Sequence, residues 1–392
     1  MNRFEYYSPT KIVFGRDAER QTGKEIKAFA GSRVFIVHTD SAEKTGLLKR
    51  VTDGLENDGL AYMTCAGVRP NPRLQFARNA VKKALGFGAD FILAVGGGSA
   101  IDTAKAVAHG VANPQADIWD FWMKKSPLEK STPVGVILTI AASGSETSES
   151  AVLTDEGTMH KQGFDSPWNR PKFAIMDPEL TFTLPKFQVA CGIVDMMMHT
   201  MDRYFTCSTG NDLTDAIAEA LLRTVIKNGR TAYANPRDYH AMSELMWCAS
   251  VSHSGLTGLG ARLDFAPHAL SRELGARYDV AHGASLAAVW GSWARYSYRD
   301  NPKRFAQYAR EVWWVDGMDD EAAAVLSIQK TEEFFVSLGM PVSFTTLGIG
   351  ILGNDTLKEL AYECCDKGTR LVGSFKELAE TDLYSIYSMA NR

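Results

Sequence analysis

Long apolar runs and an excess of positive charge are both missing from this sequence. No stretch approaches the roughly 20 apolar residues that a membrane span needs. The 392 residues carry 42 Lys and Arg against 46 Asp and Glu, so the clustered basic surface typical of nucleic-acid binding is not indicated. The beginning, MNRFEYYSPTKIVFG, lacks the apolar core of a signal peptide. We therefore expect a cytoplasmic protein without membrane or nucleic-acid partners.

Cysteine is scarce, and no two cysteines form a CxxC pair. The spacings suggest no disulfide framework, and the expected compartment favours reduced thiols. The six cysteines are Cys65, Cys191, Cys207, Cys248, Cys364 and Cys365.

The first half of the chain alternates short apolar runs with amphipathic stretches. Strands are predicted over 33–38, 91–95, 134–139 and 173–176, with helices between them, for example over 71–85 and 100–111. Strands that alternate with helices predict a parallel sheet in an α/β layer.

After Pro185 the strand signal disappears. Helices are predicted over 186–206, 213–228, 236–256, 283–298, 302–314, 319–338 and 356–366, separated by turn signals such as Ser208-Thr-Gly210. The sequence therefore predicts an α/β domain over residues 1–186 and an all-helical domain over residues 187–392.

A glycine-rich turn follows the strand predicted over 91–95. It reads Gly96-Gly-Gly-Ser99 and runs into Ala100-Ile-Asp-Thr-Ala-Lys105, and Ser99 is a plausible helix N-cap. A strand, a tight glycine turn and a helix start can cradle a phosphate with backbone N–H groups. The usual GxGxxG fingerprint is absent, so an ordinary structural turn is an equally good interpretation of this segment alone.

A second loop strengthens the phosphate interpretation. Thr139-Ile-Ala-Ala-Ser143-Gly-Ser-Glu146 also follows a predicted strand and is rich in small hydroxyl residues. Two such loops at the carboxyl ends of parallel strands mark the crevice where α/β sheets bind ligands.

Asp195 and His199 are four residues apart in an otherwise apolar segment. This spacing puts them on one face of a helix, and a buried carboxylate needs a partner. His268 and His282 lie further along the chain. One Asp and three His would suit Fe²⁺, Zn²⁺ or Mn²⁺, but spacing alone does not separate a metal site from a salt bridge and ordinary core histidines.

In several motifs the chain resembles the iron-containing (group III) alcohol dehydrogenases, in particular the butanol dehydrogenase-like branch. The motifs occur in the same order from the N-terminus to the C-terminus. They are Tyr6-Tyr-Ser-Pro-Thr-Lys-Ile-Val-Phe-Gly15, Val68-Arg-Pro-Asn-Pro72, residues 96–105, residues 139–146, Met176-Asp-Pro-Glu179, the segment with Asp195 and His199, and the block from His268 to His282.

The resemblance implies the fold of that family, a parallel α/β dinucleotide-binding domain followed by a helical metal-binding domain, shared with dehydroquinate synthase. It also implies a catalytic divalent metal, most often Fe²⁺, with Zn²⁺ or Mn²⁺ as alternatives. The implied ligands are Asp195, His199, His268 and His282. The metal would polarise an aldehyde carbonyl as a Lewis acid while a nicotinamide supplies hydride.

The two loops are implied to bind the nicotinamide dinucleotide. The implied cofactor-binding residues are Asn71, Gly97, Gly98, Ser99, Asp102, Thr139, Ser143 and Lys161. Two of them have an alternative interpretation: Asp102 could instead cap its helix, and Lys161 could be a solvated surface lysine.

Arg272 marks a departure from the family pattern. Many relatives have a histidine there, four residues after the third metal ligand, which serves in proton relay or substrate contact. An arginine does not shuttle protons near neutral pH but can hold a carboxylate, sulfonate or phosphate bidentately. Arg272 could therefore favour a short-chain aldehyde with an anionic group, or it could point away and pair with Glu273 or Asp279.

Asp40 bears on the choice of nicotinamide cofactor. NAD-preferring relatives carry an aspartate near this position, which binds the ribose 2′-OH and repels a 2′-phosphate. NADP-preferring relatives carry glycines there, which Thr39-Asp40-Ser41 lacks. We expect NAD(H) to be favoured over NADP(H), and a homo-oligomer of two or more subunits.

Two rival functions remain. A dehydroquinate synthase-like lyase would need a basic cluster for a phosphate ester, and Lys124 with Lys125 is no obvious substitute. A non-enzymatic metal-binding protein would have no use for two nucleotide loops.

Overall fold

The computed structural model describes residues 1–158 and 160–392. The chain forms two compact units. The α/β unit comprises Tyr7–Leu184, and the helical unit comprises Pro185–Arg392 together with Met1–Tyr6.

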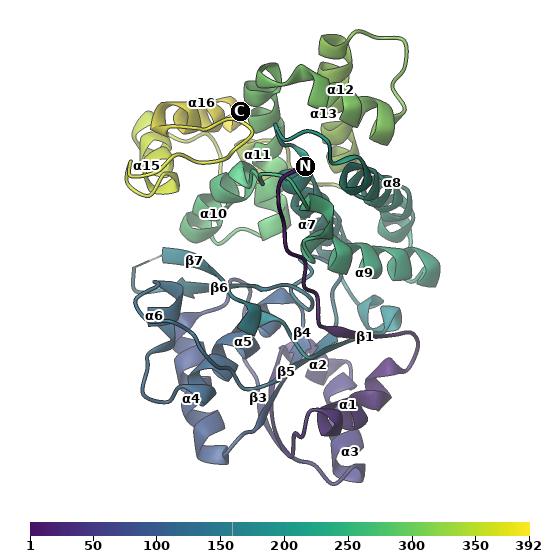
Figure 1. Cartoon of the computed structure of the whole chain (residues 1–392), viewed down its shortest axis with the longest axis vertical. Coiled ribbons are helices and arrows are strands. Elements are labelled where there is room, and N and C mark those ends of the chain that lie inside the picture. Colours follow the sequence, from purple (N-terminus) through teal and green to yellow (C-terminus); the bar gives the residue numbers. More distant parts are fainter. Residues whose placement is uncertain (159) are drawn as a thin grey trace. The chain divides into compact units, whose positions relative to one another are not determined.

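A six-stranded parallel sheet is the centre of the α/β unit (Figure 1). Its strands are β1 (Lys11–Phe14), β2 (Arg33–His38), β3 (Ala61–Cys65), β4 (Phe91–Gly96), β5 (Val134–Leu138) and β8 (Phe173–Met176). They lie in the order β1, β8, β5, β4, β2, β3, and every neighbouring pair is parallel. The predicted fold class is confirmed, and the central strands are buried on both faces because helices cover both.

One hydrophobic cluster holds helices against this sheet, and another packs helices against the strand Ser150–Asp155. The helices of the unit are α1 (Thr22–Ala28), α2 (Asp40–Lys44), α3 (Leu47–Asn57), α4 (Leu74–Phe87), α5 (Gly98–Ala112) and α6 (Ile118–Trp122). Ile26 of α1 and Val51 of α3 pack with Ile36 and Leu93 of the sheet. A second cluster joins Leu74 and Ala106, from α4 and α5, to the fully buried Trp122 of α6.

A two-stranded antiparallel hairpin completes the α/β unit. It consists of β6 (Ser150–Asp155) and β7 (His160–Asp165). Neither strand was predicted, and the pairing of Arg73 with Thr154 links the hairpin to the segment before α4.

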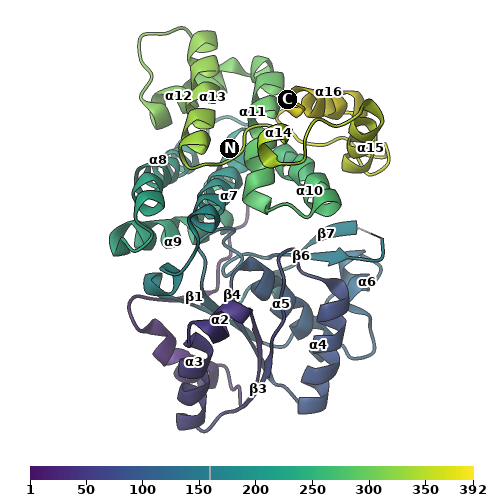
Figure 2. The ribbon, with the colours of Figure 1, turned by 180° about the vertical axis from the view of Figure 1, so that it is seen from behind.

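Helix α7 (Lys186–Tyr204) is the centre of the helical unit and is almost wholly buried. It packs against α8, α9, α10 and α11 (Figures 1 and 2). The other helices are α8 (Asp212–Ala234), α9 (Tyr239–His253), α10 (Ala266–Tyr278), α11 (His282–Ser297), α12 (Pro302–Trp313), α13 (Asp320–Ser337), α14 (Phe344–Leu347), α15 (Asn354–Cys364) and α16 (Glu380–Ala390). The seven helices predicted after residue 185 are present, whereas α10, α14 and α16 were missed.

The first six residues depart from the expected boundary, which assigned them to the α/β domain. They belong to the helical unit because backbone contacts hold them there. The amino group of Met1 donates a hydrogen bond to the carbonyl of Thr209, and the amide of Asn2 donates to the carbonyl of Gly260.

Among the described residues, no helix has both the length and the apolar character that crossing a membrane requires. All six cysteines are free, and five of them are buried.

Candidate functional site

Helix α7 presents a row of polar side chains on one buried face. Asp195, His199 and Asp202 follow one another at spacings of four and three residues, so they lie on the same side of the helix. His199 Nδ1 lies 2.9 Å from the backbone oxygen of Asp195 and 3.1 Å from its Oδ1. If Nδ1 donates to this carbonyl, the proton is fixed there, and Nε2 of His199 is left with a free lone pair.

Helices α10 and α11 bring further histidines to this face. His268 lies in the first turn of α10, and its ring centroid is 4.4 Å from that of His199. His282 is the first residue of α11, and its Nε2 lies 3.7 Å from Asp195 Oδ1. Gly283 permits this approach: a Cβ there would lie 2.2 Å from the backbone oxygen of Cys191.

Three of the expected ligands form a tight cluster. One ligand atom each from Asp195, His268 and His282 lies within 4.8 Å of the other two. His268 Nε2 is buried without a hydrogen-bond partner among the residues that the structure describes, and buried Asp195 Oδ1 has only the ion-pair contact with His199 Nδ1 at 3.1 Å and the more distant His282. Unpartnered buried polar atoms are costly, and a carboxylate with imidazole nitrogens is a donor set that suits a divalent transition metal. The residues therefore fit a cation.

The pKa shifts in the cluster favour the protonation states that bind a cation. Burial raises the pKa of the Asp195 carboxyl, but the neighbouring His199, His282 and His268 outweigh burial and hold that pKa below its usual range. Burial also lowers the pKa of His268 well below its ordinary value. An ionised carboxylate and a neutral imidazole are the states that ligate metals.

Asp202 is a partner of this cluster that the sequence analysis missed. It is 1% exposed, and its Oδ2 lies 2.5 Å from His268 Nδ1. Burial raises the pKa of Asp202 to about 8 and lowers that of His268, so one proton shared between Oδ2 and Nδ1 satisfies both groups. The signal was present in the sequence, because Asp202 follows His199 by three residues.

His253 is a second neighbour that was not singled out. It ends α9, and its ring meets that of His199 edge-on, with the centroids 4.1 Å apart. No sequence spacing connects it with the other histidines, since only the packing of α9 on α7 brings it there.

Arg272 lies one turn beyond His268 on α10 and is half-buried. Its guanidinium takes part in none of the ion pairs found among the described residues. Its positive charge acts on His268, whose pKa it helps to lower after burial and His199.

The glycine turn lies at the carboxyl edge of the sheet in the α/β unit. A Cβ on Gly97 would lie 2.1 Å from Ile140 Cγ2, and one on Gly98 would lie 2.9 Å from Ser143 Oγ. The turn after β4 and the loop after β5 therefore touch through positions where an added Cβ would force Ile140 or Ser143 to move. The two expected loops are neighbours, as their strands are.

Ser99 does not cap α5 as predicted. The helix begins at Gly98, with Gly97 as its N-cap and no side-chain hydrogen bond to the first turn. The helix starts two residues earlier than predicted because Gly97 adopts the extended conformation of an N-cap residue. The first-turn amides are left without a side-chain cap, which suits an anion.

Thr139 and Asp40 flank the glycine turn on its two sides. The amide of Thr139 donates to the carbonyl of Gly96, and the amide of Thr39 donates to the carbonyl of Val95. Asp40 follows directly as the first residue of α2 and is exposed. The ends of β2, β4 and β5 thus form one continuous edge.

Asn71 and Lys161 are brought together from distant parts of the α/β unit. Lys161 Nζ, on β7, donates a hydrogen bond of 2.8 Å to Asn71 Oδ1. Asn71 has a φ of 56°, in the left-handed region that asparagine tolerates. Lys161 is therefore held by a partner, in contrast to the alternative of a solvated surface lysine.

Asp102 does not cap α5, whose N-cap is Gly97, and two neighbouring segments hold its carboxylate. Its Oδ1 accepts a hydrogen bond from Ser145 Oγ, and its Oδ2 accepts one from the amide of Val152. These contacts join α5 to the segment after β5 rather than capping the helix.

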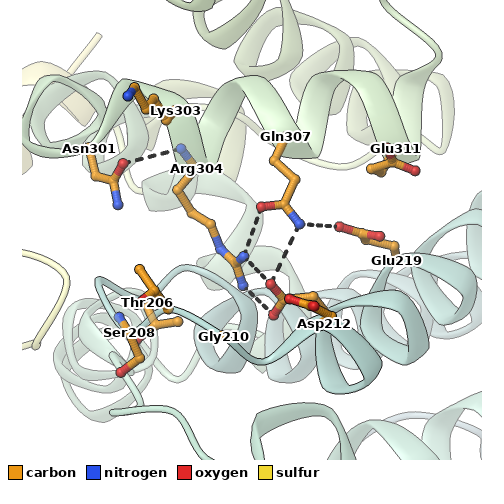
Figure 3. A pocket seen from close by; sticks show the side chains of 12 residues that line it. Thr206, Ser208, Gly210, Asp212, Glu219, Asn301, Lys303, Arg304, Gln307 and Glu311 are labelled. Carbon is orange, nitrogen blue, oxygen red and sulfur yellow. Dashed lines mark hydrogen bonds and ion pairs between the residues drawn. The ribbon is translucent and has the colours of Figure 1, made fainter. Parts of the chain in front are cut away.

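A cavity of about 530 Å³ lies elsewhere in the helical unit (Figure 3). Its wall carries Arg304, which bonds Asp215 through both terminal nitrogens, and Gln307, which bonds Glu219. None of the expected site residues lines it. Because these polar groups satisfy one another, the cavity offers no comparable set of unpartnered atoms.

Comparison with known proteins agrees with this arrangement along the whole chain. A family model described as iron-containing alcohol dehydrogenase matches residues 9–178, and one described as Fe-containing alcohol dehydrogenase family, C-terminal, matches residues 189–391. The chain is 37% identical to NADH-dependent butanol dehydrogenase A of Clostridium acetobutylicum, over 99% of each chain. It is 36% identical to the NADPH-dependent aldehyde reductase YqhD of Escherichia coli, over 89% of this chain and 90% of that one.

A solved structure gives the same result for the fold. The crystal structure of NADH-dependent butanol dehydrogenase A from Thermotoga maritima matches with a TM-score of 0.95 and 34% identity, covering 100% of this chain and 99% of that one. Fold, motifs and relatives together define a nicotinamide-dependent oxidoreductase of the alcohol dehydrogenase class. More narrowly, the chain belongs to the iron-containing alcohol dehydrogenase family, on its butanol dehydrogenase-like branch. The resemblance inferred from the motifs is thereby confirmed, and neither rival function is supported.

Proposed function

We propose that this enzyme interconverts short-chain aldehydes and primary alcohols with a divalent cation held by Asp195, His199, His268 and His282. The observation that carries the proposal is that Asp195, His268 and His282 each place one ligand atom within 4.8 Å of the other two. Fe²⁺ is the cation we expect, in line with the name of the family, while Zn²⁺ and Mn²⁺ suit the same ligands.

The residues of the cluster have distinct tasks. Asp195 supplies the negative charge, and the histidines supply neutral nitrogens. Asp202 holds the proton of His268 on Nδ1, which leaves Nε2 free, and the backbone of Asp195 does the same for His199. When bound, the cation would supply Lewis acidity toward the substrate oxygen, and the nicotinamide would supply hydride.

We assign the dinucleotide to the carboxyl edge of the sheet in the α/β unit. The uncapped first turn of α5 and the glycines beside it would receive the pyrophosphate. Thr139 and Ser143 line the adjoining loop, and the pair of Asn71 and Lys161 offers an amide and an ammonium to a ribose. The overall reaction is aldehyde plus NAD(P)H plus a proton, giving alcohol plus NAD(P)⁺.

Metal removal and add-back is the experiment that tests this function. The protein is stripped with a chelator, reloaded with Fe²⁺, Zn²⁺ or Mn²⁺, and assayed with a panel of aldehydes and both reduced cofactors. We expect no turnover after stripping and recovery with at least one cation. Full activity in stripped protein, with metal content verified by mass spectrometry, would contradict the proposal.

We further propose that NADH is preferred over NADPH. Asp40 is exposed beside the glycine turn, where its carboxylate would accept a hydrogen bond from a ribose 2′-OH and repel a 2′-phosphate. KM values for both cofactors test this preference, and replacing Asp40 by Ala should narrow the difference. A marked preference of the wild type for NADPH would contradict it.

Arg272 is our candidate for substrate selection. Its half-buried guanidinium, without an ion pair in the described residues, lies one turn from His268, so we propose that it receives the anionic group of a carboxylated or sulfonated aldehyde. Arg272→Ala should lower kcat/KM for such a substrate by about tenfold or more and change the value for butanal little. Arg277→Ala, on the same helix, serves as the control. Equal losses on both substrates would contradict the proposal.

The homo-oligomer also remains a proposal, supported by the relatedness to multi-subunit enzymes that the family resemblance implies. Light scattering of the purified protein would test it, and a monomer at assay concentration would contradict it.

A further inference from the structure

Lys105 is the most thoroughly buried charged side chain near the nucleotide loops. It lies on the second turn of α5 and is 0% exposed. Its Nζ donates hydrogen bonds to the backbone oxygens of Ser145 (2.8 Å), Ser148 (3.2 Å) and Ser150 (2.7 Å), and lies 2.9 Å from Ser145 Oγ. One ammonium group thus binds two carbonyls of the loop after β5 and the first carbonyl of β6.

Burial on this scale excludes several ordinary roles. An ammonium without access to solvent cannot meet a substrate, and burying it is costly unless partners compensate. Burial lowers the pKa of Lys105 to about 8, with the charge of Asp102 acting in the opposite direction. The contacts therefore point to a role that Lys105 performs through the loop that it holds.

Asp102 acts on the same loop from the preceding turn of α5. Its two oxygens accept hydrogen bonds from Ser145 Oγ (2.6 Å) and from the amide of Val152 (2.9 Å). Lys105 Nζ lies 4.0 Å from Asp102 Oδ1. Together the two side chains tie the second half of the loop after β5, and the start of β6, to the helix that begins in the glycine turn.

The fastened loop is the one that touches the glycine turn. Ile140 and Ser143 stand against Gly97 and Gly98 at distances that leave no room for a Cβ. Since α5 starts at Gly98, any shift of the loop relative to α5 changes the shape of the cradle. The clamp is therefore placed to set the spacing between the two loops.

We propose that Lys105 and Asp102 are positioning residues that hold the loop after β5 in register with the glycine turn, and so set the affinity for the dinucleotide. This inference rests on the proposed nucleotide site. The two residues act through the loop, so their loss should weaken cofactor binding more than it slows turnover at saturation.

The test compares variants of the metal-loaded enzyme. Lys105→Met removes the ammonium, and Ser145→Ala removes one shared hydroxyl. Thr103→Val is the matched control, because Thr103 is equally buried on α5 but its hydroxyl bonds only its own helix, at the carbonyl of Ser99. NADH dissociation constants are measured by fluorescence titration, alongside KM, kcat, the thermal midpoint and a Co²⁺ binding isotherm that monitors the helical unit.

We expect Lys105→Met to raise the dissociation constant and KM for NADH by about tenfold or more, with kcat at saturation within about threefold. Ser145→Ala should raise them by a smaller factor, and Thr103→Val should match the wild type. Co²⁺ binding should be unchanged in all three variants.

The outcomes separate this inference from the proposed function. Wild-type protein that binds neither NADH nor NADPH would overturn the nucleotide site itself. Wild-type binding together with an unchanged dissociation constant in folded Lys105→Met would overturn the clamp alone, even if the thermal midpoint fell. If Lys105→Met does not fold, Ser145→Ala and Asp102→Asn decide: wild-type affinity in both would overturn the clamp.

Discussion

The two candidate sites, the polar cluster of the helical unit and the glycine cradle of the α/β unit, are built in different ways. In the helical unit, side chains from α7, α10 and α11 converge on one point. In the α/β unit, the cradle is made of backbone at the ends of neighbouring strands, with glycines at the closest contacts. The cluster in the helical unit depends on particular side chains, whereas the cradle in the α/β unit depends on glycines, which have none.

This difference sets how each half responds to mutation. A side-chain cluster loses a ligand outright when one residue is changed, because no neighbour can replace it. A backbone cradle keeps its N–H groups after most substitutions and fails when a Cβ forces the two loops apart. The buried carboxylate of Asp202 and the buried ammonium of Lys105 play comparable parts, each orienting the groups around it.

The largest expected effect is the loss of a cluster histidine. His268→Ala removes a nitrogen that is buried without another partner in the described residues, so metal affinity should fall by more than about 100-fold, and aldehyde reduction should fall with it. Metal content by mass spectrometry and turnover measure this loss. His240→Ala, at an exposed position on α9, is the control, and normal metal content in His268→Ala would remove that histidine from the cluster.

A smaller loss is expected when only the support of that histidine is changed. Asp202→Asn keeps the size of the side chain but weakens its hold on the Nδ1 proton of His268. Metal affinity should fall by about 10- to 100-fold, with a changed absorption spectrum of the Co²⁺ form. Asp202→Glu, which retains the carboxylate, should recover part of the affinity. Identical spectra for wild type and Asp202→Asn would show that His268 is oriented without this carboxylate.

The stability of the α/β unit depends on a buried histidine that stays neutral. His109 is fully buried between Ser131 and Asn169, and burial lowers its pKa to about 4 from 6.5. As the pH falls below 6.5, His109 becomes protonated in the unfolded chain but stays neutral in the folded protein. The free energy of unfolding therefore decreases until the pH reaches the pKa of the folded state, about 4. Between pH 6.5 and 5 the loss should be about 2 kcal/mol.

Urea unfolding at several pH values measures this dependence. His109→Gln should flatten the slope between pH 6.5 and 5, whereas the exposed His160→Gln should leave it as in the wild type. If His109→Gln retains the full slope, the acid sensitivity lies elsewhere.

The smallest effect is expected for a single methyl group in the cradle. Gly97→Ala would place its Cβ 2.1 Å from Ile140 Cγ2, which must move, so KM for NADH should rise by about tenfold while metal binding stays normal. Gly86→Ala, in α4 of the same unit with open space around it, is the matched control. If Gly97→Ala has the same KM for NADH as the wild type, Ile140 can move aside without weakening cofactor binding.

Local sequence patterns were sufficient to predict single strands and helices. The four predicted strands are continuous β-branched and apolar runs, such as Phe91–Val95, and the periodic stretches after Pro185 became helices. Helix α10 was missed although it carries His268 and Arg272. Phe265 precedes it in the left-handed region, and Pro267 lies in its first turn, which reads as a loop although a helix accepts proline there.

The sequence by itself determined the classes of the two halves: a parallel α/β layer with glycine turns, then helices with one aspartate and three histidines. The layer, the turns and the shared helix face of Asp195 and His199 follow from patterns that act over a few residues, whereas the family resemblance supplied His268 and His282. Only the tertiary structure decided that His268 and His282 reach Asp195, that Asp202 supports His268, and that Lys105 binds the loop after β5. Those contacts join residues far apart in the chain, and the packing of whole helices and strands, which no local pattern encodes, brings them together.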